Sequence, residues 1–153
     1  MNSTQKNFQI LCDTLDQMHL KYEKNEAEWA IEADFSTDDL PVELHLHLVD
    51  KNQIVIFMSP LPFTVSEDKR VDLAIALHAV NFGLLDGSFD YDIEDGKIAF
   101  RLTSSYREVD LSDDVFNYML HIALVTADRF NDKFLALAKG YMSLEEFLES
   151  LDA

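Results

Sequence analysis

The fold is decided by Asn81-Phe-Gly-Leu-Leu-Asp-Gly87-Ser-Phe-Asp-Tyr-Asp92 and by the residues that follow, Ile93-Glu-Asp95-Gly96-Lys-Ile-Ala-Phe-Arg101. Apolar side chains occupy every second position of 89–93 and again of 98–102, which is the period of a half-buried strand. Asp95 and Gly96 lie between these runs, and an Asp-Gly pair there predicts a tight hairpin with φ > 0 at both residues. Asn81 then marks a helix end, and Gly87 marks a turn with positive φ.

Three further strands are predicted upstream of this hairpin. Residues 29–35 alternate apolar side chains with mostly acidic ones, and residues 42–48 alternate apolar side chains with glutamate and histidines. Both patterns are typical of strands with one buried face. Residues 53–59 form the third strand, and we expect Pro60 and Pro62 to end it because proline cannot donate to a strand ladder.

Two helices are predicted around these strands. Apolar residues recur at helical spacing over 4–22, which indicates an amphipathic helix. Ser66 is placed to cap a second helix over 67–85, which is apolar nearly all round. We therefore expect this central helix to be buried on more than one side, against a sheet, another helix or a partner subunit.

A long helix and a short one are predicted after the hairpin. Ser112 is a good N-cap for a helix that ends at Ala138, and Ser143 with Glu146 forms a capping box for a helix to about residue 151. The order is therefore α-β-β-β-α-β-β-α-α. It predicts a single α+β domain over 1–153 with a largely antiparallel, five-stranded sheet.

The charge balance limits the partners that the chain can have. It has 153 residues with 29 acidic and 12 basic side chains, a formal net charge of −17. A field of that sign repels phosphate backbones and anionic lipid headgroups, so we expect no nucleic acid and no membrane as direct partner. Residues 1–8 lack the pattern of a signal peptide, so the cytoplasm is the expected location.

No motif of a catalytic site is present in the sequence. There is no Gly-rich phosphate loop, nucleophile elbow, Cys-x-x-Cys or His-Glu-x-x-His. The one cysteine, Cys12, falls among the apolar positions of the first helix and is best explained as a small buried hydrophobe. We therefore expect no enzymatic activity and no cofactor.

The stretch from Asn81 to Asp92 and on through Arg101 resembles the YbjN family, which comprises proteins assigned as bacterial sensory-transduction regulators. The shared features are the Asn that closes the helix, the Gly-x-Phe strand start at Gly87, the Gly hairpin and an aromatic-Arg pair. The element order is also similar to the type III secretion chaperone fold. The resemblance implies a non-enzymatic protein-binding module, a chaperone-like or regulatory adaptor in a bacterial cytoplasm that binds protein segments as a homodimer. It implies no catalytic residues.

A metal-binding or small-molecule regulator is the alternative function. Glu43, His45 and His47 are spaced by two along one predicted strand, so their side chains share a face. Two imidazoles and a carboxylate could bind a divalent metal. We favour the simpler interpretation, in which these residues are the solvated side of the strand and no metal binds.

A docking surface is predicted on the third strand. Val55 and Phe57 lie opposite Ile54 and its neighbours in the alternation. If the helices cover only the face of Ile54, then Val55 and Phe57 are exposed together with Val49. The alternative, that this strand is central and covered on both faces, stays open because the sequence does not give the position of a strand in its sheet.

Overall fold

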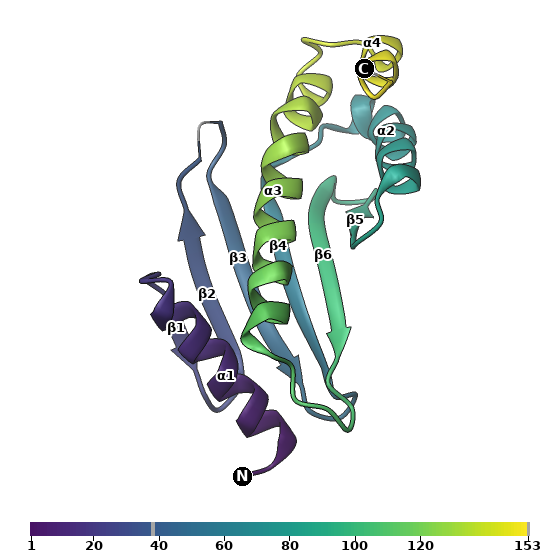
Figure 1. Ribbon diagram of the computed structural model, residues 1–153. Helices are drawn as coiled ribbons and strands as arrows, with labels where there is room; N and C mark the ends of the chain where they lie inside the picture. Colours follow the sequence, from purple (N-terminus) through teal and green to yellow (C-terminus); the bar gives the residue numbers. More distant parts are fainter. Residues whose placement is uncertain (38, 153) are drawn as a thin grey trace.

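The computed structural model describes residues 1–37 and 39–152, which form an α+β structure built on one antiparallel sheet (Figure 1). The strands lie in the order β1-β2-β3-β4-β6-β5. The elements are α1 Ser3–Gln17, β1 Glu23–Asn25, β2 Ala30–Phe35, β3 Val42–Val49, β4 Ile54–Thr64, the 3-10 helix η1 Glu67–Lys69, α2 Arg70–Gly83, β5 Ser88–Asp92, β6 Lys97–Ser105, α3 Asp113–Ala138 and α4 Leu144–Ser150. None of the helices in this part of the chain is long and apolar enough to cross a membrane.

The sheet has six strands, so the prediction of five was wrong. The additional strand is β1, which pairs with β2 from Glu23 opposite Glu32 to Asn25 opposite Ala30. All three of its residues are polar and exposed, so it carries no apolar alternation that a sequence pattern could reveal. The first helix is correspondingly shorter than 4–22, because His19 turns the chain with φ 58° after α1 ends.

Strand β4 continues through both prolines to Thr64, which corrects the prediction that they end it. Its pairing with β3 runs only as far as Met58, opposite His45, whereas its pairing with β6 continues past Pro60. Beyond Met58 the strand is therefore an edge on the β3 side, where the missing N–H of a proline breaks no ladder bond. The pairing of β4 with β6 shifts register between Pro60 and Thr64, and this irregularity accommodates Pro62.

Helices α1 and α3 cover one face of the sheet (Figure 1). Helix α3 begins at Ser112 as predicted, where the hydroxyl oxygen accepts a hydrogen bond from the N–H of Val115. It crosses β3, β4 and β6, and the ring of Phe116 stacks on that of Phe57 with centroids 6.4 Å apart. The residues of β3, β4 and β6 that face the helices are almost fully buried: Leu44, Leu46, Leu48, Val55, Phe57, Ile98, Phe100 and Leu102.

An aromatic cluster joins the hairpin to the C-terminal helices. Phe89 of β5 makes edge contacts with Phe100 at 5.2 Å, Phe130 at 6.0 Å and Phe134 at 5.1 Å between ring centroids. Phe134 in turn stacks on Phe147 of α4 at 5.5 Å. Such pairs add about 0.5–1.5 kcal/mol each beyond the area that they bury. Strand β5, helix α3 and helix α4 are thus held together by one continuous cluster of aromatic rings.

The hairpin between β5 and β6 is confirmed, but its turn is longer than the predicted Asp-Gly turn. Gly96 has φ 71°, whereas Asp95 is not among the described residues with positive φ. The loop is formed by residues 93–96, because the N–H of Gly96 donates to the carbonyl of Asp92 at 2.7 Å. The carboxylate of Asp92 also accepts from the N–H groups of Glu94 and Asp95. An Asx turn therefore sets the loop.

We predict that Gly96→Val lowers the free energy of unfolding by about 1–3 kcal/mol, because a β-branched residue at positive φ is strained. A Cβ at this position would also lie 2.3 Å from the carbonyl oxygen of Val65. Chemical denaturation measures the change. Gly83→Ala is the matched control, since a Cβ there meets nothing within 4 Å. Equal midpoints for Gly96→Val and wild type would contradict this account of the turn.

Candidate functional site

The two strand residues proposed for docking, Val55 and Phe57, lie in the core. Each is 0% exposed beneath α3, so the prediction that they are exposed was wrong. The cause is the composition of β4, because Ile54 to Met58 are apolar at every position. Such a run does not indicate which of its faces a helix covers. Long α3 packs on Val55 and Phe57, and the alternate residues point the other way.

The opposite face of the sheet is apolar along its centre. We define the open sheet face as the half-buried residues there whose side chains are apolar: Ala30, Val49, Ile54, Ile56, Met58, Pro60 and Ala99. Val49 pairs directly with Ile54, so it lies on this accessible face and not on the face of Val55 and Phe57, where it was predicted. Within residues 1–37 and 39–152, the helices that pack on the central strands lie on the other face.

A polar rim flanks the open sheet face on both sides. On one side, β3 places His47 opposite Ile56 and His45 opposite Met58. On the other side, β6 places Thr103 and Arg101 opposite the same two residues. An apolar centre inside a polar rim is the arrangement found in protein–protein interfaces.

The rim on the β2–β3 side is acidic. Glu43 and Asp34 pair across the two strands, and Glu32 pairs with His45. The His45 ring contacts both glutamates, with Nε2 2.7 Å from Glu43 Oε1 and Nδ1 3.3 Å from Glu32 Oε1. On the β6 side, Arg101 Nε lies 2.8 Å from Asp90 Oδ2. The excess negative charge is therefore on the β2–β3 side.

The structure does not bring Glu43, His45 and His47 together as a metal site. They share a face, as the alternation predicted, but the ring nitrogens of His45 contact glutamates, and His47 lies beside Ile56 and Ala30. Among the residues that the structure describes, no group of three or more His, Cys, Asp or Glu could hold a metal ion.

Helix α2 leaves a second apolar surface uncovered. Its inner residues Leu73, Ala76, Leu77 and Val80 are buried. On the outer side, Val71 is 65% exposed, Ile75 44%, Phe82 89% and, just after the helix, Leu85 102%. We call these four residues the α2 stripe. The signal for it was the apolarity of the helix on nearly every side, and no element within residues 1–37 and 39–152 buries the stripe.

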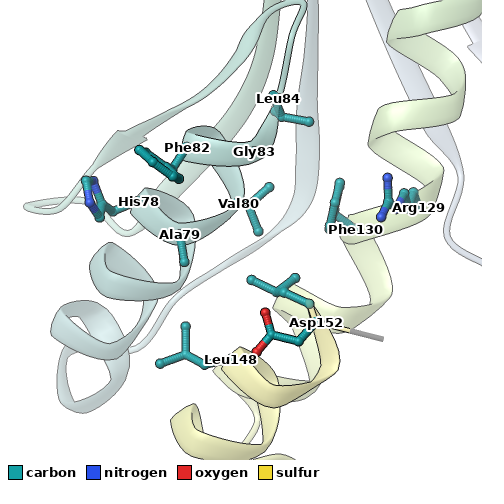
Figure 2. Close-up of a pocket in the computed structure, with 11 residues that line it drawn as sticks. His78, Ala79, Val80, Phe82, Gly83, Leu84, Arg129, Phe130, Leu148 and Asp152 are labelled. Atoms are coloured by element: carbon teal, nitrogen blue, oxygen red, sulfur yellow. The ribbon is translucent and has the colours of Figure 1, made fainter.

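A cleft of about 680 Å³ lies beside the α2 stripe, between α2, α3 and α4. Figure 2 shows Val80 of α2, Phe130 of α3 and Leu148 of α4 around it. Phe82 of the stripe also lines it, and the Arg129 guanidinium lies 4.8 Å from the centroid of the Phe130 ring. Most of the lining is apolar, and His78 and Asp152 are its other ionisable residues besides Arg129. A mostly apolar cleft with a few polar groups is typical of a binding site.

Helix α2 continues past Asn81 to Gly83, so the prediction that Asn81 ends it was wrong. The side chain of Asn81 instead joins the helix to the hairpin. Its side-chain nitrogen donates to the carbonyl of Phe89 at 3.0 Å, and its side-chain oxygen accepts from the N–H of Phe89 at 2.8 Å. Phe89 belongs to β5, an edge strand. The Asn81 amide thus takes the place of a neighbouring strand at Phe89, which protects the edge against pairing with another chain. Gly87, with φ 72°, is the turn glycine that was predicted.

Three groups with raised pKa values are held in their neutral forms. Burial raises the pKa of the Cys12 thiol, which disfavours the nucleophilic thiolate. Burial likewise raises the pKa of Tyr106, whose hydroxyl lies 2.7 Å from that of Thr4. A hydrogen bond to Asp86 raises the pKa of Tyr118. A raised pKa keeps these three groups protonated and activates none of them as a nucleophile or base.

We predict that zinc binds only weakly at His45, because two imidazoles and a carboxylate do not converge there. Within residues 1–37 and 39–152, no three His, Cys, Asp or Glu side chains are grouped to hold the ion. Isothermal titration calorimetry with zinc measures this, and His121→Ala serves as a control for an exposed histidine elsewhere. A stoichiometric, tight site that disappears in His45→Ala and persists in His121→Ala would show the prediction to be wrong.

Comparison with known proteins identifies the fold. No family model matches the chain, and no curated protein matches it. A chain of the ExsC–ExsE complex matches with a TM-score of 0.58 and 19% identity, over 86% of this chain and 96% of that one. A chain of the HopA1–SchA chaperone–effector complex matches with a TM-score of 0.56 and 12% identity, over 86% and 99%.

The third comparison is with YbjN from E. coli, a proposed transcription regulator. It matches with a TM-score of 0.55 and 15% identity, over 76% of this chain and 82% of that one. At these identities the likeness concerns the fold. The chain therefore has a YbjN-like fold, which is also the fold of type III secretion chaperones, as its element order suggested.

Proposed function

We propose that this protein is a non-enzymatic, chaperone-like module that binds other proteins and acts as a homodimer. The observation that carries the proposal is the α2 stripe. Its side chains extend from a rigid helix whose inner side is fixed in the core. The exposed His78 interrupts the stripe between Ile75 and Phe82. Exposed apolar side chains grouped on one side of a helix in this way usually mark a contact site.

The stripe can supply the free energy that association needs. Burying a large aliphatic or aromatic side chain contributes about 1.5–3 kcal/mol. Val71 and Phe82 are 65% and 89% exposed, so most of that gain is still available to them. A second copy that presents the same stripe would bury both surfaces at once in an interface with twofold symmetry.

The net charge of −17 opposes association of two copies. Salt screens such repulsion over about 8–10 Å at physiological ionic strength. The apolar contribution is not weakened by this screening. Self-association should therefore become tighter as salt rises, which is the opposite of an association driven by attraction between charges.

The shared fold supports a protein as the partner. Among the similar solved structures, HopA1–SchA is a chaperone–effector complex and ExsC–ExsE is also a complex. A role as a regulatory adaptor in a bacterial cytoplasm is part of the proposal, and the likeness to YbjN supports it.

We predict a dimer at micromolar concentration that is tighter at about 0.5 M salt than at about 0.02 M, because screening removes repulsion and leaves apolar burial. Sedimentation equilibrium at both salts measures it. Ile75→Glu should weaken the dimer about tenfold or more, since it places a charge in the buried contact. Val109→Glu is the control, because Val109 is 52% exposed at a distant loop and Ile75 is 44% exposed.

Two outcomes would contradict the dimer. One is a monomer at both salts up to about 100 μM, which corresponds to a binding free energy weaker than about −5.5 kcal/mol. The other is a dimer that Ile75→Glu and Val109→Glu weaken equally, which would place the contact away from α2.

A further inference from the structure

The open sheet face combines features that rarely occur together on a solvated sheet. Ile54, Ile56 and Met58 take consecutive outward positions on central strand β4 and are only half-buried, by their lateral neighbours. A sheet with one wet face normally carries polar residues at such positions. The apolar row therefore needs a cover that the described part of the chain does not provide.

The edges of the sheet are poor places for a partner strand, which leaves the face. At β5, the Asn81 side chain occupies the backbone groups of Phe89. At the other edge, β1 has only three residues, all polar and exposed. The edge that β4 forms beyond Met58 contains Pro60 and Pro62. Short or capped edges discourage strand addition. A partner that uses this sheet is thus directed to the open sheet face.

The dimensions of the row fit a helix. Ile54 to Met58 span about 13 Å at the rise of a strand, which matches about two to three turns of α-helix. The opposite face already accepts α1 and α3 in this way (Figure 1). A helix laid on the open sheet face would complete a third layer, an arrangement that buries both faces of a sheet.

The charges around the row specify the chemistry of that helix. On the β2–β3 side, the register places Glu32 level with Met58, and Asp34 and Glu43 beyond it. A hollow of about 350 Å³ beside these three is also lined by Glu23, with Lys21 as the one cation in its lining. On the far side, Arg101 is paired with Asp90. Basic side chains are therefore favoured along one flank of the partner and not along the other.

From these observations we propose that the open sheet face binds an amphipathic helix of another protein, with apolar residues over Ile54, Ile56 and Met58 and a basic flank over Glu32, Asp34 and Glu43. The inference rests on the proposed protein-binding function and specifies a surface and a partner chemistry that are separate from the α2 stripe. Charge asymmetry fixes the orientation of the helix across the strands.

The test uses the full chain and two synthetic helical peptides of about four turns. Both carry leucines at i, i+3, i+4 and i+7; one has lysines along a single flank, and its twin has glutamates there. Fluorescence anisotropy measures binding at low and moderate salt. We expect the lysine peptide to bind and to weaken as salt rises, and the glutamate twin to bind at least about tenfold more weakly.

Variants separate the surface from the overall charge. Ile56→Thr keeps a β-branched residue in the strand. It should lower the affinity for the lysine peptide about tenfold, because it removes apolar contact at the centre of the open sheet face. Glu32→Gln combined with Glu43→Gln should also lower the affinity for the lysine peptide and reduce the salt dependence of that affinity. Glu145→Gln combined with Glu149→Gln removes the same charge from exposed positions of α4 and should leave binding within about twofold.

Three outcomes would overturn the proposal. The first is that the lysine peptide does not bind at about 100 μM. The second is that the α4 double variant weakens peptide binding as much as the β2–β3 double variant does. The third is that Ile75→Glu abolishes peptide binding while Ile56→Thr leaves it intact, which would place the peptide on the α2 stripe. Sedimentation of each variant shows whether it still dimerises. The failure of this inference and the failure of the proposed dimer are thereby distinguishable.

Discussion

The structure depends on the packing of one long helix across one face of one sheet. Helix α3 stacks Phe116 on Phe57 and brings Phe130 and Phe134 against Phe89. That contact decides which residues of β4 are inside. Because side chains alternate along a strand, burying Val55 and Phe57 turns the intervening residues outward. The accessible apolar row on the far face is therefore a direct consequence of the core.

The same packing explains why α2 is covered on one side only. Its inner residues meet α3, α4 and β5, and Asn81 ties its end to Phe89 of the hairpin. The helix is held firmly, yet Val71, Ile75 and Phe82 have no partner in the described chain to bury them. A net charge of −17 keeps copies apart at long range, while apolar surfaces act at contact. Two uncovered apolar surfaces on a rigid, acidic frame suit a protein that recognises other proteins.

The parts of the fold that were predictable have local causes. The N-cap at Ser112 and the capping box at Ser143 and Glu146 are formed by neighbours in sequence, and both are present. The inward face of β4 could not be predicted, because its apolar run satisfies either face and the choice is made by α3, more than fifty residues away. The polar, exposed residues of β1 form a strand through backbone pairing with β2, which no side-chain pattern indicates. The turn at Gly96 depends on the Asp92 carboxylate and on the hydrogen bond that the N–H of Val65 donates to the Gly96 carbonyl. The hydrogen bonds of the Asn81 side chain require the hairpin to be in place.

The most direct test of the central claim, that α2 serves self-association while the far face of the sheet stays free, is hydroxyl-radical footprinting across a range of protein concentrations. Phe82 reports on the α2 stripe and Met58 on the open sheet face, with Met18, 42% exposed, as an internal reference. The account predicts that oxidation of Phe82 falls as the protein associates, while oxidation of Met58 stays constant relative to Met18. Loss of Met58 oxidation with Phe82 unchanged would contradict it, because the two copies would then meet through the sheet.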